Sequence, residues 1–351
     1  MRLESLADGL RDAGFTAARA VALLGAEDDA DLLSHAALYA YVSAERVDDL
    51  LTSPAGVLTQ LFVRNGPVRR EVYARMLPAS LRGLLDEHGL VTPGEGTVAG
   101  SVSISPAGSL YFLSDPLFSS DGAIKLSAEP ALVMPPHAST FALLHNLGEV
   151  RGRLLDVGSG CGVLALSLMD RCSAVTGIDL NPRSVEFSQL NARVNGLRAE
   201  FRHAAFGPGF EPAGPADALV FNTPTGPGHR SLAEVGQMTA RRALDLVTSA
   251  TGVLRSGALA YVLLIVEVPA DRPSAADLVR GWIPDGWQAS ATELPGSPLA
   301  CSRAAMDTGR LAFGSVLAAD ARDAERLIGR LRARGIAEVM PVLVTLTPPA
   351  A

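Results

Sequence analysis

Cysteine is scarce in this sequence of 351 residues, and the pattern of the few cysteines excludes two kinds of structural support. Cys161, Cys172 and Cys301 show neither the paired spacing of a zinc site nor the even number of a disulfide framework. We therefore expect no metal and a chain that folds on its hydrophobic core, for which a hydrophobic share of 48% is ample. At about 100–200 residues per domain, the length predicts two domains.

Long apolar runs are absent as well. A membrane-spanning helix needs about 18 or more consecutive apolar residues. The nearest candidate, 253–269, is interrupted by Arg255, Ser256 and Gly257, and its β-branched second half is typical of a buried strand. The first residues carry charges throughout and lack the apolar core of a secretion signal. We expect a cytoplasmic protein with no membrane partner.

Positive charge is in short supply, because 30 Lys and Arg residues face 37 Asp and Glu residues, for a net charge of −7. A long phosphate backbone would meet a repulsive average field, so we expect no nucleic-acid partner. This matters for residues 1–120, where three helix-like segments over 54–91 precede two strand-like runs that flank Pro106-Ala107-Gly108. Three helices and a hairpin are typical of a winged-helix domain. We expect a mainly helical, winged-helix-like substrate or lid domain, and DNA binding is the alternative.

From about residue 150 the pattern changes to strand–helix alternation, which predicts an α/β, doubly wound, parallel sheet. We expect residues 121–150 to be a linker and lead-in, and residues 151–351 to form a seven-stranded Rossmann-like domain. The expected strands are 153–157, 174–179, 199–203, 217–222, 258–268, 287–293 and 340–347. The expected helices are 162–170, 183–195, 231–249, 273–282 and 320–334.

The stretch "LLDVGSGCGVLALSL" (154–168) is the most informative part of the sequence. An apolar strand ends near Asp156, then Gly158, Gly160 and Gly162 follow, and a helix begins at once. Glycines let the backbone turn tightly and approach a ligand, and a helix N-terminus presents free N–H groups. Further along, Asp179 stands at the tip of the second strand, where a carboxylate accepts hydrogen bonds from both ribose hydroxyls.

A nicotinamide cofactor is one alternative for such a loop, and two details argue against it. The spacing is G-x-G-x-G, and Asp156 inside the strand end would repel a pyrophosphate but attract an amino-acid ammonium group. Both details fit S-adenosylmethionine as the cofactor.

With these residues the chain resembles the class I S-adenosylmethionine-dependent methyltransferases. It is most similar to the "small-domain" group, which includes ribosomal RNA guanine and release-factor glutamine methyltransferases. The resemblance covers about 150–270, and a looser one to two-domain actinobacterial members covers 1–150. It implies that the methionine end of the cofactor contacts Asp156, Gly158 and Gly160, the ribose Asp179, and the adenine Leu180 and Asn181.

Two departures from the group's pattern bear on function. Ala204 stands where the group usually has an Asp that holds the adenine amine. The group's acceptor motif is Asn-Pro-Pro-aromatic, whereas "FNTPTGPGHR" (221–230) keeps Asn222 and has Thr225 in place of the ring. A stacked base or a glutamine amide is therefore not the expected acceptor.

Candidate catalytic residues follow from this loop and from the segment that enters the domain. Asn222 is expected to contact the cofactor and to orient the acceptor. His229 is expected to act as a general base and Arg230 to clamp a carboxylate or sulfate. A solvated loop is the alternative for the last two. In the lead-in 127–144, the candidate is His137. Three further residues of that segment are candidates for the pocket: Glu129, Ser139 and Thr140.

The first hypothesis is methyl transfer to a small polar acceptor, a small-molecule substrate of specialised, natural-product metabolism. The alternative keeps the fold and changes the reaction to an intramolecular cyclisation or elimination, of the kind that forms an aziridine in azinomycin-type biosynthesis. Binding of S-adenosylmethionine separates the two, because a cyclase need not hold that cofactor.

Overall fold

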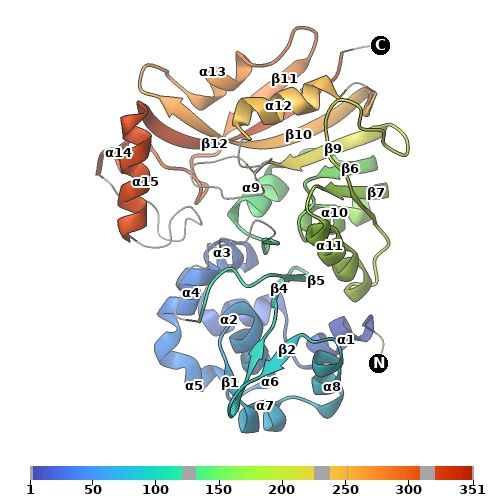
Figure 1. Cartoon of the computed structure of the whole chain (residues 1–351), viewed down its shortest axis with the longest axis vertical. Coiled ribbons are helices and arrows are strands. Elements are labelled where there is room, and N and C mark those ends of the chain that lie inside the picture. The colour runs from blue at the N-terminus through green and yellow to red at the C-terminus, as the bar shows by residue number, and fades with distance from the viewer. Residues whose placement is uncertain (1–2, 121–131, 225–237, 251, 309–320, 350–351) are drawn as a thin grey trace.

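The computed structural model describes residues 3–120, 132–224, 238–250, 252–308 and 321–349. Figure 1 shows a mainly helical N-terminal part, coloured blue to cyan, beside an α/β core that is coloured green to red. Helix α9 of the core contacts α3 of the N-terminal part where the two meet. No helix within these ranges is both long enough and apolar enough to cross a membrane.

Short helices make up most of the N-terminal part. They are α1 (Ser5–Asp12), α2 (Ala17–Leu24), α3 (Asp29–Ser34), α4 (Ala36–Val42), η1 (Ala44–Arg46), α5 (Val47–Leu50), α6 (Pro54–Leu58), the π-helical turn η2 (Thr59–Val63), α7 (Arg70–Met76) and α8 (Ala79–Glu87). Several of them begin at a capping side chain, such as Thr16 before α2 and Ser53 before α6. Their apolar faces enclose one core that contains Leu58, Leu61 and Phe62.

The strands of this part form two separate sheets, whereas one hairpin was predicted. Strands β1 (Val68–Arg69), β3 (Thr97–Gly100) and β2 (Val91–Pro93) pair in that order. Strands β4 (Ser103–Ala107) and β5 (Leu110–Ser114) form a hairpin of their own. Its turn lies at Gly108-Ser109, at the C-terminal end of the predicted turn. The winged-helix interpretation stays a prediction.

The core contains a seven-stranded sheet in the order β11-β12-β10-β9-β6-β7-β8. Its strands are β6 (Gly152–Val157), β7 (Cys172–Asp179), β8 (Glu200–His203), β9 (Ala216–Asn222), β10 (Leu254–Pro269), β11 (Gln288–Glu293) and β12 (Ile336–Thr347). Its helices are α9 (Ala138–Asn146), α10 (Val163–Ser167), η3 (Met169–Arg171), α11 (Pro182–Val194), α12 (Ala240–Ser249), α13 (Ala275–Arg280), α14 (Arg303–Thr308) and α15 (Ala321–Ala333). All seven predicted strands are present, and the predicted helix 231–249 begins at Ala240 within the described residues.

The prediction of a parallel sheet is wrong for one strand. Strand β12 runs antiparallel to both of its neighbours, β10 and β11, so the sheet is mixed. Strand–helix alternation gave no sign of this, because chain direction depends on the path of the connections and leaves no mark on hydrophobic periodicity.

Helices cover both faces of the sheet. Leu155, Val157 and Leu219 pack with α12 and α13 on one face, and Leu154 and Val220 pack with α9, α10 and α11 on the other. Alternate residues of a strand point to opposite faces, which is why both faces are apolar. The strand order reverses at β6, which pairs with β7 on one side and β9 on the other. In open α/β sheets, ligands bind beyond the carboxyl ends of the strands at such a reversal.

Candidate functional site: a cavity at the glycine loop

The loop after β6 adopts a conformation that needs glycine. Gly158, Gly160 and Gly162 have φ values of +67°, +55° and +84°, in the left-handed region that side chains disfavour. A Cβ atom on Gly162 would also come within 3.2 Å of Ser188 and Phe201. The loop therefore turns directly from the buried strand into α10, as the sequence predicted.

Asp179 at the end of β7 fixes the backbone of this loop. The N–H groups of Gly160 and Asn181 each donate to its carboxylate, both at 2.8 Å. Burial raises the pKa of Asp179, although these backbone hydrogen bonds oppose the shift. The Ser184 side chain donates to the same carboxylate. An ionised carboxylate has about four acceptor positions, so capacity for a further donor remains.

Asp156 does not line the cavity, contrary to the expectation that it contacts the methionine end of a cofactor. Its side chain has 0% exposure, and one carboxylate oxygen accepts from the Ala165 N–H at 3.0 Å. The other oxygen, Oδ1, has no hydrogen-bond partner among the described residues. Burial, with a smaller contribution from the charge of Asp179, raises the pKa of Asp156 to about 8. The strand end is covered by its own loop and helix, and this covering withdraws the carboxylate from the cavity.

A cavity of about 360 Å³ opens beside the loop. This volume lies within the range of about 300–1,000 Å³ that is typical of small-molecule sites. The walls come from the lead-in segment, the glycine loop and the ends of β7, β8 and β9. The lining residues on which the argument depends are His137, Ser139, Gly158, Ser159, Gly160, Asp179, Leu180, Asn181, Ala204, Phe206 and Asn222.

Most residues that the sequence singled out therefore lie around one space. Gly158, Gly160, Asp179, Leu180 and Asn222 line the cavity. His137, Ser139 and Thr140 of the lead-in line it too, although they are distant from the loop in sequence. The remaining candidates, Glu129, Thr225, His229 and Arg230, lie outside the described residues, so their roles stay predictions.

A hydrogen-bonded chain of three side chains crosses the cavity wall. The Asn222 Nδ2 group donates to Ser139 Oγ at 2.9 Å, and Ser139 Oγ lies 3.1 Å from His137 Nε2. His137 Nδ1 lies 3.1 Å from the carbonyl oxygen of Pro135, which can only accept. In a neutral ring the proton is thus on Nδ1, and Nε2 accepts from the Ser139 hydroxyl. We call these three side chains the Asn222–Ser139–His137 relay.

Sequence reasoning named the relay's members as separate candidates and missed their connection. Asn222 and Ser139 are 83 residues apart, and no local pattern links them. The wall at the end of β8 carries Ala204 at the position where the group usually has an Asp. Ala204 and Phe206 make that wall apolar, and Phe206 packs edge-on against Phe221 with ring centroids 6.4 Å apart.

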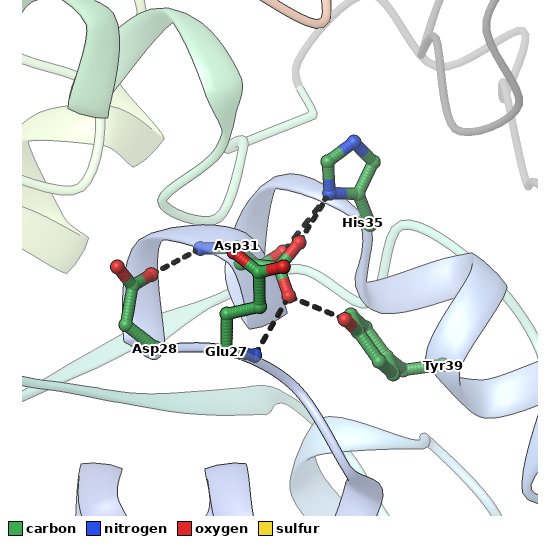
Figure 2. Close-up of polar contacts among 5 residues, drawn as sticks. All are labelled: Glu27, Asp28, Asp31, His35 and Tyr39. Atoms are coloured by element: carbon green, nitrogen blue, oxygen red, sulfur yellow. Dashed lines mark hydrogen bonds and ion pairs between the residues drawn. The ribbon is translucent and has the colours of Figure 1, made fainter.

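A second polar cluster lies outside the cavity walls, on α3 and α4 of the N-terminal part (Figure 2). Asp31 accepts from the Glu27 N–H at 3.0 Å, from the Tyr39 hydroxyl and from His35 Nδ1 at 3.0 Å. Burial would raise the pKa of Asp31, but these hydrogen bonds outweigh it and hold the pKa below its ordinary value.

Comparison with known proteins identifies the part of the chain that builds the cavity. Residues 137–264 match the model of the methyltransferase small domain family. This part of the chain is similar to the class I S-adenosylmethionine-dependent methyltransferases. This confirms the predicted resemblance, and S-adenosylmethionine is the cofactor of this class.

Curated relatives match the sequence of this chain over part of their length. The release factor glutamine methyltransferase of Deinococcus radiodurans is 31% identical over 188 residues, which are 48% of this chain and 64% of the relative. The ribosomal protein L11 methyltransferase of the same organism is 37% identical over 87 residues, 23% of this chain and 32% of the relative. The chain thus spans less than two thirds of these relatives. A solved structure, the [4+2]-cyclase SpnF, is 20% identical with a TM-score of 0.38, covering 56% of this chain and 75% of its own.

The residues of the methyltransferase domain fit S-adenosylmethionine. Asp179 lines the cavity and keeps acceptor capacity for a ribose hydroxyl, and the left-handed glycines leave the loop without side chains where the cofactor would approach. Ser159 Oγ is buried without a hydrogen-bond partner among the described residues, in a residue that lines the cavity. A buried polar atom without a partner is costly and suits a site completed by a ligand. At the end of β8, the wall that adenine would face is apolar at Ala204 and Phe206.

Proposed function

We propose that this chain transfers the methyl group of S-adenosylmethionine to an oxygen or nitrogen atom of a small polar acceptor. The observation that carries the proposal is the Asn222–Ser139–His137 relay, which lines the same cavity as the glycine loop and Asp179. The bound cofactor would supply an electrophilic methyl group. The protein's contribution is to hold the acceptor in line with that group and to receive the acceptor's proton.

The relay is suited to that proton transfer. Ser139 Oγ already accepts from Asn222 and donates to His137 Nε2, so one lone pair of the oxygen is left for an acceptor's O–H or N–H. When the acceptor's proton moves to Ser139 Oγ, the serine proton moves to His137 Nε2. His137 keeps its Nδ1–H bond to the Pro135 carbonyl and becomes an imidazolium. Asn222 holds the serine oxygen in place during this step.

The charge of the walls indicates the chemical class of the acceptor. Among the described residues of the lining, Asp179 is the one that carries a full charge, and no Lys or Arg is present. A carboxylate or phosphate acceptor would find no cation there unless Arg230 supplies one. An alcohol or amine with an apolar body fits better. We also propose that the enzyme acts in natural-product metabolism, because Thr225 stands where the group has the aromatic residue that clamps a flat acceptor.

One observation favours the second candidate, a methyltransferase-fold enzyme that catalyses cyclisation or elimination. The cavity wall at Ala204 offers no side-chain hydrogen bond to adenine, which would weaken binding of the cofactor's adenosyl group by about 1 kcal/mol. The same cavity would then take a substrate in place of the cofactor. Binding of S-adenosylmethionine by the purified chain decides between the two candidates.

The direct test uses methyl-tritiated S-adenosylmethionine. The full chain is incubated with the dialysable small-molecule fraction of an extract of the source organism's cells and, in parallel, with the protein fraction. We expect label transfer to a compound of the dialysable fraction, and transfer to the protein fraction alone would contradict the small-molecule proposal.

Ser139→Ala then tests the relay. Loss of a positioned proton acceptor reduces turnover by about 100-fold or more, so we expect a fall in kcat of that size with unchanged cofactor binding. Thr140→Val is the matched control, because Thr140 lies on the same helix and lines the same cavity outside the relay. Equal turnover of the two variants would contradict the relay's role.

A further inference from the structure

Asn191 of helix α11 and Asn195, the residue at its C-cap, cover the open edge of hairpin strand β5. Asn195 accepts from the Tyr111 N–H at 2.9 Å and donates to the Tyr111 carbonyl at 2.7 Å. Asn191 makes the same pair of hydrogen bonds with Leu113, at 2.8 and 2.9 Å. The asparagines are four residues apart on one helix face, and the strand residues are two apart on one edge. Their spacing lets the two side chains act as a neighbouring strand would.

Asn191 has an additional partner in the glycine loop. Its Nδ2 group also donates to the carbonyl of Cys161 at 2.8 Å. A side-chain amide has two N–H donors, and here one holds the hairpin at Leu113 and the other holds the loop. The preceding carbonyl of the loop, Gly160, accepts from Ser188 Oγ at 2.7 Å. Helix α11 therefore fixes two successive loop carbonyls.

The surroundings leave Asn191 little freedom to move. Its side chain has 0% exposure, and its three hydrogen bonds bind it to both parts of the chain. A buried amide cannot move toward one partner without breaking a hydrogen bond to the other, and an unmade buried hydrogen bond is costly. A shift of the hairpin is thus transmitted to the backbone beside Gly160, whose N–H group bonds to Asp179.

We infer that Asn191 is a positioning residue that couples the seating of the β4–β5 hairpin to the shape of the glycine loop and hence to cofactor affinity. The inference rests on the proposed cofactor site. In this inference the N-terminal part has a function in the methyltransferase domain: through Asn191, its hairpin holds the glycine loop in the shape that binds the cofactor.

Three variants of the full chain separate the contacts. Asn195→Ala removes the contact with Tyr111 of the hairpin and keeps the contacts with the loop. Ser188→Ala removes the contact with the Gly160 carbonyl of the loop and keeps both hairpin contacts. Asn191→Ala removes the contacts with both Leu113 of the hairpin and Cys161 of the loop. S-adenosylhomocysteine is titrated into each variant by calorimetry. We expect affinity to fall about ten-fold for Asn191→Ala and less than about three-fold for Asn195→Ala, since only the former releases the loop.

Amide hydrogen exchange supplies a readout that does not depend on a variant. In the wild-type chain, S-adenosylhomocysteine should slow exchange at Leu113 more than at Tyr111, although both amides bond to α11. In Asn191→Ala the ligand should no longer slow exchange at Leu113, while in Ser188→Ala it still should. If Asn191→Ala does not fold, the comparison within the wild-type chain decides.

The outcomes distinguish this inference from the proposed function. Equal affinities of Asn191→Ala and Asn195→Ala, with exchange at Leu113 unchanged by the ligand, would overturn the coupling and leave the cofactor site standing. Failure of the wild-type chain to bind S-adenosylhomocysteine would overturn the proposed function and, with it, this inference.

Discussion

Aspartates of the N-terminal part and of the core show how a structural carboxylate differs from one at a ligand site. Asp31 has a side chain that is 24% exposed, and it accepts from a backbone N–H, a tyrosine hydroxyl and an imidazole. Asp156 is fully buried and accepts one hydrogen bond, while Asp179 accepts two from the backbone at a cavity wall. The pKa of Asp31 is held below its ordinary value, whereas burial raises the pKa of Asp156 and Asp179.

The difference follows from how deeply each carboxylate is buried, because Asp31 and Asp179 each accept three hydrogen bonds from the protein. Hydrogen bonds to the charged form offset the cost of burial at Asp31 and do not offset it at the two core positions. A stable scaffold needs the first arrangement. At Asp179, which lines the cavity, hydroxyl groups of a cofactor would add further donors. The polar cluster of Figure 2 is thus a support for α3 and α4, and Asp179 is the core carboxylate that lies at the site.

The largest expected effect is the pH dependence that Asp156 gives to stability. Its pKa is raised from 3.8 to about 8 on folding, so its contribution to stability is complete below the lower value and is lost as pH rises through the higher one. The slope approaches about 1.4 kcal/mol per pH unit. The side chain that Asp156→Asn introduces does not titrate. As pH rises from 4 to 8, the free energy of unfolding of the wild type should therefore fall relative to that of the variant. Urea unfolding at a series of pH values measures this, and a constant difference would contradict the burial argument.

The next effect in size concerns Asp179. In the proposed cofactor site Asp179 accepts from the ribose, so we expect Asp179→Ala to cost about 1.5–3 kcal/mol in the binding free energy of S-adenosylmethionine. Calorimetry measures it, with Asp31→Asn as the matched control in the N-terminal part. The comparison of the two regions fails if both variants weaken binding to the same extent.

Asp31 should show the smallest effect, with the opposite sign of pH dependence. Because its folded pKa is lowered, its contribution to stability is present above 3.8 and is lost as pH falls through the folded value. Asp31→Asn should therefore destabilise the chain at pH 7, by less than about 1 kcal/mol since the group is partly exposed. The difference should vanish in acid. Asp8→Asn, at a side chain that is 74% exposed, is the control.

The sequence predicted those features that depend on local spacing. Strand and helix order came from hydrophobic periodicity, and the glycine loop with Asp179 at the next strand end came from a short motif. Features that depend on distant segments were missed. The antiparallel direction of β12, the bond between Asn222 and Ser139, and the contact from α11 to the hairpin have no local signal. The withdrawal of Asp156 was missed because spacing places a residue at a strand end without showing whether the next helix covers it.

The central claim is that the transferable methyl group lies against the Asn222–Ser139–His137 relay. The direct measurement is an isotope-edited nuclear Overhauser experiment on the full chain with S-adenosylmethionine that carries a ¹³C-labelled methyl group. The account predicts cross-peaks from the labelled methyl group to the Asn222 side-chain amide protons and to the Ser139 β-protons. A bound cofactor whose methyl group shows cross-peaks to other residues and none to these two would contradict it.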